Sequence, residues 1–249
     1  MAKKSKIKYP RYNNYVTSFY RIGFDGFIPN VKYKPFNSLY PDVCAWQFPD
    51  LDLIDYLYNH IIGLKDNEEL SKGHCMHNGQ TDEFTHVKDS YDLSYNVNSG
   101  AYCHDSVEEF DIANKTIFNW INFCNLDYCT RNISVANEPF AIEYSNIQYQ
   151  YYDPGGGFKI QHHERSMAVP NSFTNQQREL VFMMYLNDNE DGGTHFVSKG
   201  VTMPAKKGLT VIFPAGHEFQ HVSQISQTKE KMIITGWLVT NPPWTHNVS

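Results

Sequence analysis

A histidine and a glutamate lie two residues apart in the segment Gly155 to Arg165, which reads Gly-Gly-Gly-Phe-Lys-Ile-Gln-His-His-Glu-Arg. We expect this segment to lead into a strand, where residues i and i+2 project from the same face. His162 and Glu164 can then converge on one point. His163 and Arg165 would point away from it. An imidazole and a carboxylate at one point indicate a metal site.

Two ligands hold a metal ion weakly, so the hypothesis requires another imidazole from elsewhere in the chain. The later segment Phe213 to His221, Phe-Pro-Ala-Gly-His-Glu-Phe-Gln-His, offers His217 and His221. Two imidazoles and one carboxylate on one side of an ion form the facial arrangement that suits non-haem Fe(II) and its oxygen chemistry.

A lysine also enters an apolar strand pattern, Lys231-Met-Ile-Ile-Thr-Gly-Trp-Leu. Burying an ammonium group without an anionic partner is costly, so Lys231 predicts such a partner. A dicarboxylic cosubstrate would supply one. The run Gly155–Gly157 lets the backbone turn sharply before the first two ligands.

The composition is that of a globular protein with much β structure. Of 249 residues, 41% are hydrophobic and 19% charged, and the 17 Tyr and 16 Phe suit half-buried strand positions. One structural domain is the default at this length. The net charge of -6 and pI near 6.0 predict no general attraction to nucleic acid or to an anionic membrane.

The five cysteines indicate a reducing environment. They are odd in number and form no CxxC pair, so we expect no disulfide framework. No secretory leader and no apolar run of about 18 residues is recognisable, which predicts a cytoplasmic protein. The cysteines are Cys44, Cys75, Cys103, Cys124 and Cys129.

The first half of the chain predicts an arm and two helices. Residues 1–48 read as an irregular arm with a short strand at Val16–Ile22. A helix should begin after the N-cap Asp50 and stop at Gly63, and a second should run from Asp105 or Ser106 to Cys124. Residues 64–104 should hold loops and short extended pieces around Phe84–Val87 and Leu93–Val97.

After Asn125 the pattern becomes that of successive short strands, which favours a sandwich or a squat barrel. We expect one structural domain in three parts: the arm at 1–48, a helical support region at 49–135 and a β core at 136–249. The predicted strands are Ala141–Tyr152, Phe158–Glu164, Arg178–Leu186, Thr194–Ser198, Leu209–Phe213, Phe219–Ser223 and Lys231–Val239.

From about Gln148 to Trp237 the sequence resembles the Fe(II)- and 2-oxoglutarate-dependent dioxygenases, in particular the prolyl 4-hydroxylase-like branch, including enzymes of phage and marine bacterial type. The resemblance rests on an ordered series of motifs. They are Tyr152-Asp-Pro-Gly-Gly-Gly-Phe158, His162-His-Glu164, Tyr185-Leu-Asn-Asp, Asp191-Gly-Gly-Thr-His-Phe196, Pro204-Ala-Lys-Lys-Gly208, Ile212-Phe-Pro-Ala215, His221, Lys231 and Thr235-Gly-Trp237.

The resemblance implies a mainly β protein, a double-stranded β-helix (jelly-roll) core supported by N-terminal α-helices. It also implies that His162, Glu164 and His221 bind Fe(II). His221 is preferred to His217 because its ten-residue separation from Lys231 matches the family spacing. The family usually has Asp where this chain has Glu164, which lengthens that ligand by one methylene.

The same resemblance implies a 2-oxoglutarate site in which Lys231 pairs with the distal carboxylate. Tyr185, Tyr152 and Thr235 stand where phenol and hydroxyl groups can reach the cosubstrate. His195 and Arg178 remain open as contacts to substrate.

The implied reaction uses Fe(II), 2-oxoglutarate and O2 to hydroxylate a C–H bond, with release of succinate and CO2. The substrate would be a prolyl residue or another small or peptidyl molecule. Glu164 favours hydroxylation over halogenation, because related halogenases leave that ligand position to chloride. The alternative is a catalytically silent β-helix that binds a metal or ligand, and it has no need of Lys231 and Tyr185 together. Neither the oligomeric state nor the substrate follows from the sequence.

Overall fold

The computed structural model describes residues 42–77, 80–101, 107–131, 140–165 and 178–240. The predicted strand at Val16–Ile22 and the predicted caps Asp105 and Ser106 lie outside these residues.

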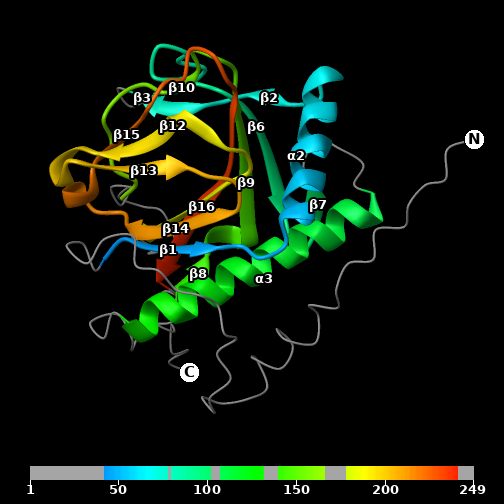
Figure 1. Ribbon diagram of the computed structural model, residues 1–249, viewed down its shortest axis with the longest axis horizontal. Coiled ribbons are helices and arrows are strands. Elements are labelled where there is room, and N and C mark those ends of the chain that lie inside the picture. Colours follow the sequence, from blue (N-terminus) through cyan, green and yellow to red (C-terminus); the bar gives the residue numbers. More distant parts are fainter. Residues whose placement is uncertain (1–41, 78–79, 102–106, 132–139, 166–177, 241–249) are drawn as a thin grey trace, which may run out of the picture.

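Two antiparallel sheets form the body of the protein (Figure 1). The large sheet has nine strands in the order β1-β14-β11-β16-β9-β6-β2, with β7 beside β6 and β8 beside β16, and the small sheet has the order β13-β12-β15. This is the expected jelly-roll. The large sheet comprises β1 (Cys44–Gln47), β2 (Ser71–Lys72), β6 (Tyr91–Asn96), β7 (Gly100–Ala101), β8 (Phe140–Ile142), β9 (Asn146–Tyr152), β11 (Arg178–Tyr185), β14 (Leu209–Pro214) and β16 (Lys231–Thr240), and the small sheet β12 (Asn189–Phe196), β13 (Val201–Ala205) and β15 (His221–Ser223).

Two short ladders complete the β structure. Strand β10 (Gly157–Phe158) pairs with β5 (Lys88–Asp89), and β3 (Cys75–His77) pairs with β4 (Gln80–Asp82). The ladder of β10 and β5 ties the residues just before His162 to the region that precedes β6.

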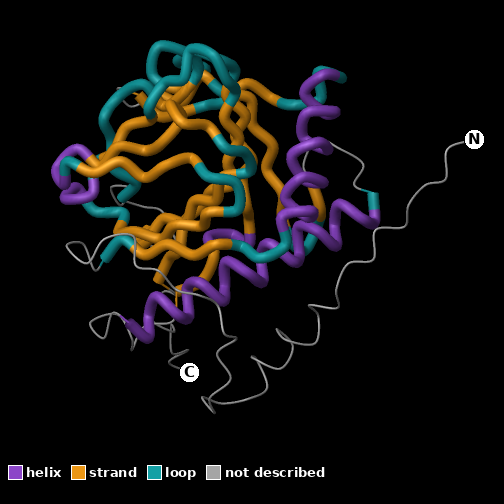
Figure 2. The backbone as a smooth tube through the Cα atoms, in the orientation of Figure 1, coloured by secondary structure: helices purple, strands orange, loops and turns teal. Residues whose placement is uncertain are grey.

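Both helices cover the outer face of the large sheet, on the side away from the small sheet (Figure 2). Helix α2 spans Leu51–Asp66 and helix α3 spans Glu108–Arg131. Their apolar side chains share one buried cluster with the sheet. The indole of Trp120 on α3 donates to the Thr210 hydroxyl on β14 at 2.8 Å, which fixes the helix to the sheet.

Alternation along the strands separates this outer core from the interior of the jelly-roll. On β9, Tyr149 and Tyr151 belong to the core under the helices, whereas Tyr152 belongs to a second buried cluster between the sheets. On β16, Ile234 packs under the helices and Ile233 packs between the sheets. Because side chains alternate with period two, Lys231 lies on the same inner face as Ile233.

Three of the seven predicted strands are confirmed closely, whereas the predicted strand Ala141–Tyr152 is broken by the short helix η2 (Glu143–Ser145), and the predictions Thr194–Ser198 and Phe219–Ser223 each include part of a short helix. Strands β11, β14 and β16 begin at the predicted residues and end within one residue of the prediction. These three strands are largely buried on both faces, and their continuous runs of apolar residues make the signal strong.

Several predictions were wrong in detail. The end of the expected irregular arm forms β1, which pairs with β14. The extended piece expected around Leu93–Val97 is confirmed as β6, which joins the large sheet. Phe84–Val87 contains a turn, and Val201–Ala205 is a strand that the pattern did not indicate. The predicted strand Phe158–Glu164 is reduced to β10 and a single bridge at His162.

The expected stop of the first helix at Gly63 was also wrong. Asp50 caps the N-terminus as predicted, its side chain accepting from the Leu53 amide, but α2 continues to Asp66. The helix ends where the Asn67 amide donates to the Gly63 carbonyl. A glycine inside a helix is tolerated at a cost in backbone entropy.

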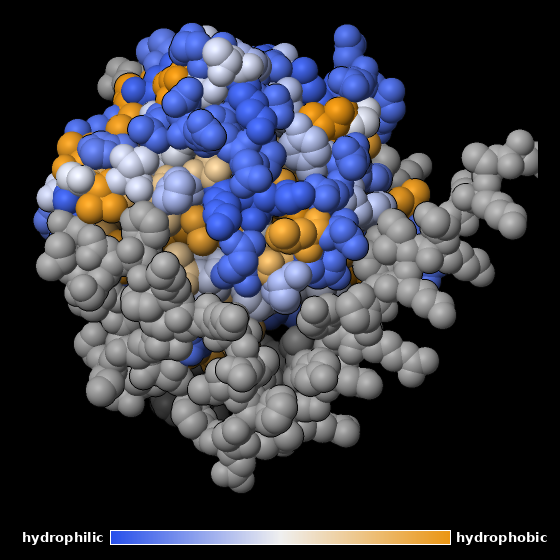
Figure 3. All heavy atoms as spheres, viewed as in Figure 1, coloured by the Kyte–Doolittle hydropathy of each residue, from blue (hydrophilic) through white to orange (hydrophobic). Residues whose placement is uncertain are grey.

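The surface of the described residues is largely hydrophilic on the face shown in Figure 3, with hydrophobic residues scattered over it. Within the described residues, no helix has the length and apolar character needed to cross a membrane.

The interior position of Gly63 gives the first prediction. We expect Gly63→Ala to raise the free energy of unfolding by about 0.5–1 kcal/mol, because alanine is the better helix former. A Cβ at this position meets no atom within 4 Å. Urea denaturation followed by circular dichroism measures the change. A loss of stability would mean that Gly63 ends the helix in a left-handed conformation.

Candidate metal and cosubstrate site

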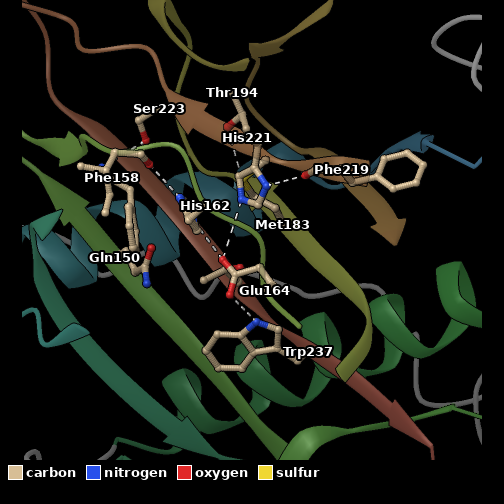
Figure 4. A network of polar contacts seen from close by, with 12 residues as sticks. Gln150, Phe158, His162, Glu164, Met183, Thr194, Phe219, His221, Ser223 and Trp237 are labelled. Atoms are coloured by element: carbon tan, nitrogen blue, oxygen red, sulfur yellow. Dashed lines mark hydrogen bonds and ion pairs between the residues drawn. The ribbon is translucent and has the colours of Figure 1, made fainter. Parts of the chain in front are cut away.

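His162, Glu164 and His221 come together at the edge where the two sheets meet (Figure 4). His221 is the first residue of β15, and His162 pairs with it as an isolated antiparallel bridge, with N···O distances of 3.1 and 2.9 Å. The Glu164 amide donates to the Ala215 carbonyl at 3.2 Å, just beyond β14. Backbone bonds therefore hold all three residues, although the segment around His162 is no regular strand.

The three side chains point their ligand atoms at one another. Glu164 Oε1 lies 3.3 Å from His162 Nε2 and 3.8 Å from His221 Nε2. One ligand atom from each residue lies within 4.8 Å of the others, which is close enough to hold a metal ion. His163 and Arg165 are exposed and face away, and Arg165 pairs with Glu179 at 2.7 Å.

Backbone carbonyls fix the tautomers of both imidazoles. His162 Nδ1 lies 2.9 Å from the Ile160 carbonyl and His221 Nδ1 lies 3.0 Å from the Phe219 carbonyl. A carbonyl can only accept, so each Nδ1 carries a proton, and Nε2 of the neutral ring holds a lone pair. Two such nitrogens and a carboxylate oxygen repel one another unless a cation lies between them, so the donor set fits a metal ion.

The electrostatics of the cluster favour its metal-binding form. Burial alone would raise the pKa of Glu164, but the adjacent imidazoles of His162 and His221 and the indole N–H of Trp237 lower it to about 2. Burial lowers the pKa of His221 to about 4, and the neighbouring His162 adds to the shift. At neutral pH the carboxylate is charged and His221 is neutral, which are the states that ligate.

Trp237 holds the carboxylate from behind. Its Nε1–H donates to Glu164 Oε2 at 2.9 Å, so the other oxygen, Oε1, faces the imidazoles. The Arg178 guanidinium lies 3.4 Å from the centroid of the indole ring and pairs with Glu143 at 3.0 Å. Partners of this kind orient ligands and tune their basicity.

Aromatic rings surround the histidines. Phe158 stacks on His162 with ring centroids 3.7 Å apart, and Phe213 meets His221 edge-on at 5.1 Å. These contacts fix the planes of the two imidazole rings.

Lys231 lies at the inner end of β16 and is only 4% exposed. Its Nζ donates to the Ser223 hydroxyl at 3.0 Å and lies 4.9 Å from the centroid of the Tyr152 ring. Within the described residues no carboxylate is in salt-bridge distance of this ammonium group. Burial lowers the pKa of Lys231 to about 7. The position therefore suits an external anion.

The hydroxyls of the other three predicted cosubstrate residues already have acceptors. Tyr152 donates to Gln150 Oε1 at 2.6 Å, Tyr185 to Thr194 Oγ1 at 2.8 Å, and Thr235 to the Phe182 carbonyl at 2.9 Å. Tyr152 and Tyr185 are buried between the sheets.

The remaining histidine candidates lie apart from the cluster. His217 is in the short helix η4 (His217–Phe219), and its side chain is 83% exposed. His195 Nδ1 lies 2.9 Å from the Thr202 hydroxyl, between two strands of the small sheet.

Sequence reasoning missed two residues of the site. Trp237 was given no role at the site from the sequence, yet its indole N–H donates to the Glu164 carboxylate. Ser223 was not considered, although it follows His221 by two residues and so shares its face of β15. The two-residue spacing from His221 could have identified Ser223 from the sequence.

The family comparison agrees with this geometry. Residues 147–239 match the model of the 2OG-Fe(II) oxygenase superfamily, a segment that contains every ligand candidate and Lys231. This segment belongs to that superfamily, and the protein is by class a 2-oxoglutarate-dependent non-haem iron dioxygenase. Its cofactor is Fe(II), and 2-oxoglutarate and O2 are its cosubstrates. A search of curated protein sequences found no match.

Solved structures share the fold at low sequence identity. A prolyl-4-hydroxylase from Pseudomonas putida has a TM-score of 0.55 at 16% identity, over 79% of this chain and 92% of that one. A prolyl hydroxylase from Trichoplax adhaerens, in complex with a hypoxia inducible factor oxygen degradation domain peptide fragment, has a TM-score of 0.58 at 13% identity, over 80% and 83%. These likenesses confirm the jelly-roll of the prolyl 4-hydroxylases.

The Trp237 hydrogen bond gives a second prediction. We expect Trp237→Phe to weaken Mn(II) or Co(II) binding roughly ten- to a hundredfold, because the carboxylate loses the donor that orients it. Calorimetric titration of the purified apoprotein measures the affinity. Trp120→Phe is the matched control, because it removes an indole N–H that bonds Thr210. Equal metal affinity in both variants would contradict the role of Trp237.

Proposed function

We propose that His162, Glu164 and His221 hold Fe(II), that Lys231 binds the distal carboxylate of 2-oxoglutarate, and that the protein hydroxylates a C–H bond of its substrate with release of succinate and CO2. The observation that carries this proposal is a buried, carboxylate-free lysine close to a convergent His-Glu-His cluster. Ser223, the partner of Lys231, shares strand β15 with the ligand His221. The bound metal and cosubstrates would supply the oxidant, and the chain supplies binding and orientation.

Tyr152 and Tyr185 would complete the cosubstrate end, with Thr235 further along the face of β16. Burial raises the pKa of both phenols well above the ordinary value for tyrosine. They therefore stay neutral beside an anion. Tyr152 also lies under the Lys231 ammonium, and the face of an aromatic ring attracts a cation.

The charges near the metal cluster bear on the substrate. Arg178 pairs with Glu143, and Lys88 pairs with Asp92 at 2.5 Å. Each of these charged side chains is already paired with an opposite charge in the protein, as is Arg165, which pairs with Glu179. A free amino acid or a nucleotide needs uncompensated charges to hold it. The pairing therefore favours a substrate whose contacting part is uncharged, such as a residue inside a peptide.

The inner wall of β9 and β6 offers polar groups to such a substrate. Gln150 Nε2 donates to Gln148 Oε1 at 3.3 Å, and Gln148 Nε2 donates to Asp92 at 3.0 Å. Each carboxamide keeps one N–H and one lone pair outside this chain of bonds. Neutral amide groups of a peptide are suitable partners. The fold shared with prolyl hydroxylases, one of them bound to a peptide, favours prolyl peptides as the first candidates.

Succinate release tests the function. Purified protein with Fe(II), 2-oxoglutarate, O2 and a panel of proline-containing peptides should form succinate and a product heavier by one oxygen atom, measured by NMR and mass spectrometry. Free proline should give no product. Glu164→Ala should abolish turnover, because two imidazoles hold the metal weakly. A panel of peptides without any product would contradict the peptidyl substrate.

The buried lysine predicts a pH dependence of 2-oxoglutarate binding. The dianion favours the ammonium form, so above the free-site pKa of about 7 binding must take up a proton. We expect affinity to be constant below pH 7 and to fall up to about tenfold per pH unit above it. Calorimetry on the Mn(II)-loaded protein measures this profile.

The matched control for this profile is Lys231→Arg. A guanidinium stays protonated over the whole range, so the fall above pH 7 should disappear. A profile that is the same in both proteins would assign the pH dependence to another group.

A further inference from the structure

Ser223 contacts Lys231 through its side chain and lies on the same strand, β15, as the ligand candidate His221. Its hydroxyl oxygen accepts from the Lys231 ammonium at 3.0 Å and from the Phe158 backbone N–H at 3.3 Å (Figure 4 shows Ser223 beside Phe158). A hydroxyl has two lone pairs and one proton. Both lone pairs are used, so the proton is the free part of the group.

That proton has no acceptor within the described part of the chain. The hydroxyls of Tyr152, Tyr185 and Thr235, by contrast, donate to protein acceptors at 2.6–2.9 Å. For any of these three to donate to a cosubstrate, an existing hydrogen bond would have to break. Ser223 can donate with both of its own bonds intact.

The position of Ser223 suits a carboxylate that is paired with Lys231. The serine is partly exposed, whereas the lysine is buried. Thr194, the hydrogen-bond partner of Tyr185, lies opposite Ser223 in the small sheet. The hydroxyl and the ammonium therefore approach the same small volume from β15 and β16.

Gly157 makes this arrangement possible. A Cβ on Gly157 would lie 3.2 Å from Ser223 Cβ and 2.3 Å from Ile225 Cδ1. The close approach of this backbone lets the next amide, that of Phe158, reach the serine oxygen. Phe158 in turn stacks on His162, so the orientation of Ser223 is set from the metal side of the site.

We propose that Ser223 is a cosubstrate-binding residue whose hydroxyl donates a hydrogen bond to the distal carboxylate of 2-oxoglutarate beside Lys231. This inference rests on the proposed function. It adds a donor that the motifs did not indicate and makes Ser223 the hydroxyl partner of the lysine.

The test is the binding of 2-oxoglutarate to Mn(II)-loaded protein, measured by calorimetry in the absence of turnover. A hydrogen bond to a charged group contributes enough that Ser223→Ala should weaken the affinity about tenfold to a hundredfold. Ser223→Thr keeps the hydroxyl and should restore most of it. Ser226→Ala removes a buried serine hydroxyl that bonds the Lys229 amide, and affinity should not change.

A second ligand separates the distal carboxylate from the metal-binding end. 2-Oxovalerate has the same five-carbon 2-oxo acid skeleton but no distal carboxylate, so Ser223→Ala should leave its affinity unchanged. Equal weakening of both ligands would overturn the assignment, since it would place the defect at the metal.

The failure of this inference is distinguishable from failure of the proposed function. If Ser223→Ala binds 2-oxoglutarate like the parent protein while Lys231→Ala loses it, Ser223 is no ligand and the cosubstrate site stands. If the metal-loaded parent protein binds no 2-oxoglutarate, both proposals fall.

Discussion

The structure depends on the backbone bridge between His162 and His221, two residues that lie far apart in the chain. The two N–H···O bonds of this bridge bring both imidazoles to one place, and the adjacent bond from Glu164 to Ala215 adds the carboxylate. Three electron-pair donors facing one another are unfavourable without a cation. The protein holds this arrangement with backbone bonds, buried aromatic rings and an indole N–H, which is the preorganisation that a metal centre requires.

The interior of the jelly-roll is divided by chemistry. Near Lys231 the walls are phenols, hydroxyls and apolar side chains, and the ammonium there has no carboxylate partner among the described residues. Along β9 and β6 the wall is carboxamide and compensated charge, as in the bonds between Gln150, Gln148 and Asp92. The surroundings of Lys231 therefore favour an anion, and the wall of β9 and β6 favours a neutral polar group.

The two helices stabilise the large sheet on the face opposite the site. Helices α2 and α3 bury the outer face of the large sheet, so the inner faces of β9 and β16 can carry polar residues without loss of the core. The same alternation that places Tyr149 and Ile234 under the helices turns Gln150 and Lys231 towards the site. The outer face of the large sheet thus carries the core under the helices, and the inner face carries both a second buried cluster and the polar residues of the site.

The sequence by itself determined the strand-rich fold, the first helix and its Asp50 cap, and the candidate pair His162 and Glu164, because spacing and alternation are local properties. It also singled out Lys231, since a lysine in an apolar strand is anomalous wherever that strand lies. The resemblance to the family already preferred His221 to His217, and the structure brings His221 to the pair and leaves His217 exposed. Only the tertiary structure decided that Trp237 holds the carboxylate and that Ser223 links Lys231 to Phe158. These are contacts between strands far apart in the chain, and hydrogen-bond direction depends on distances that no local pattern contains. The short extended segment around His162 was mistaken for a full strand for the same reason, because a single bridge to a distant residue gives no periodic signal.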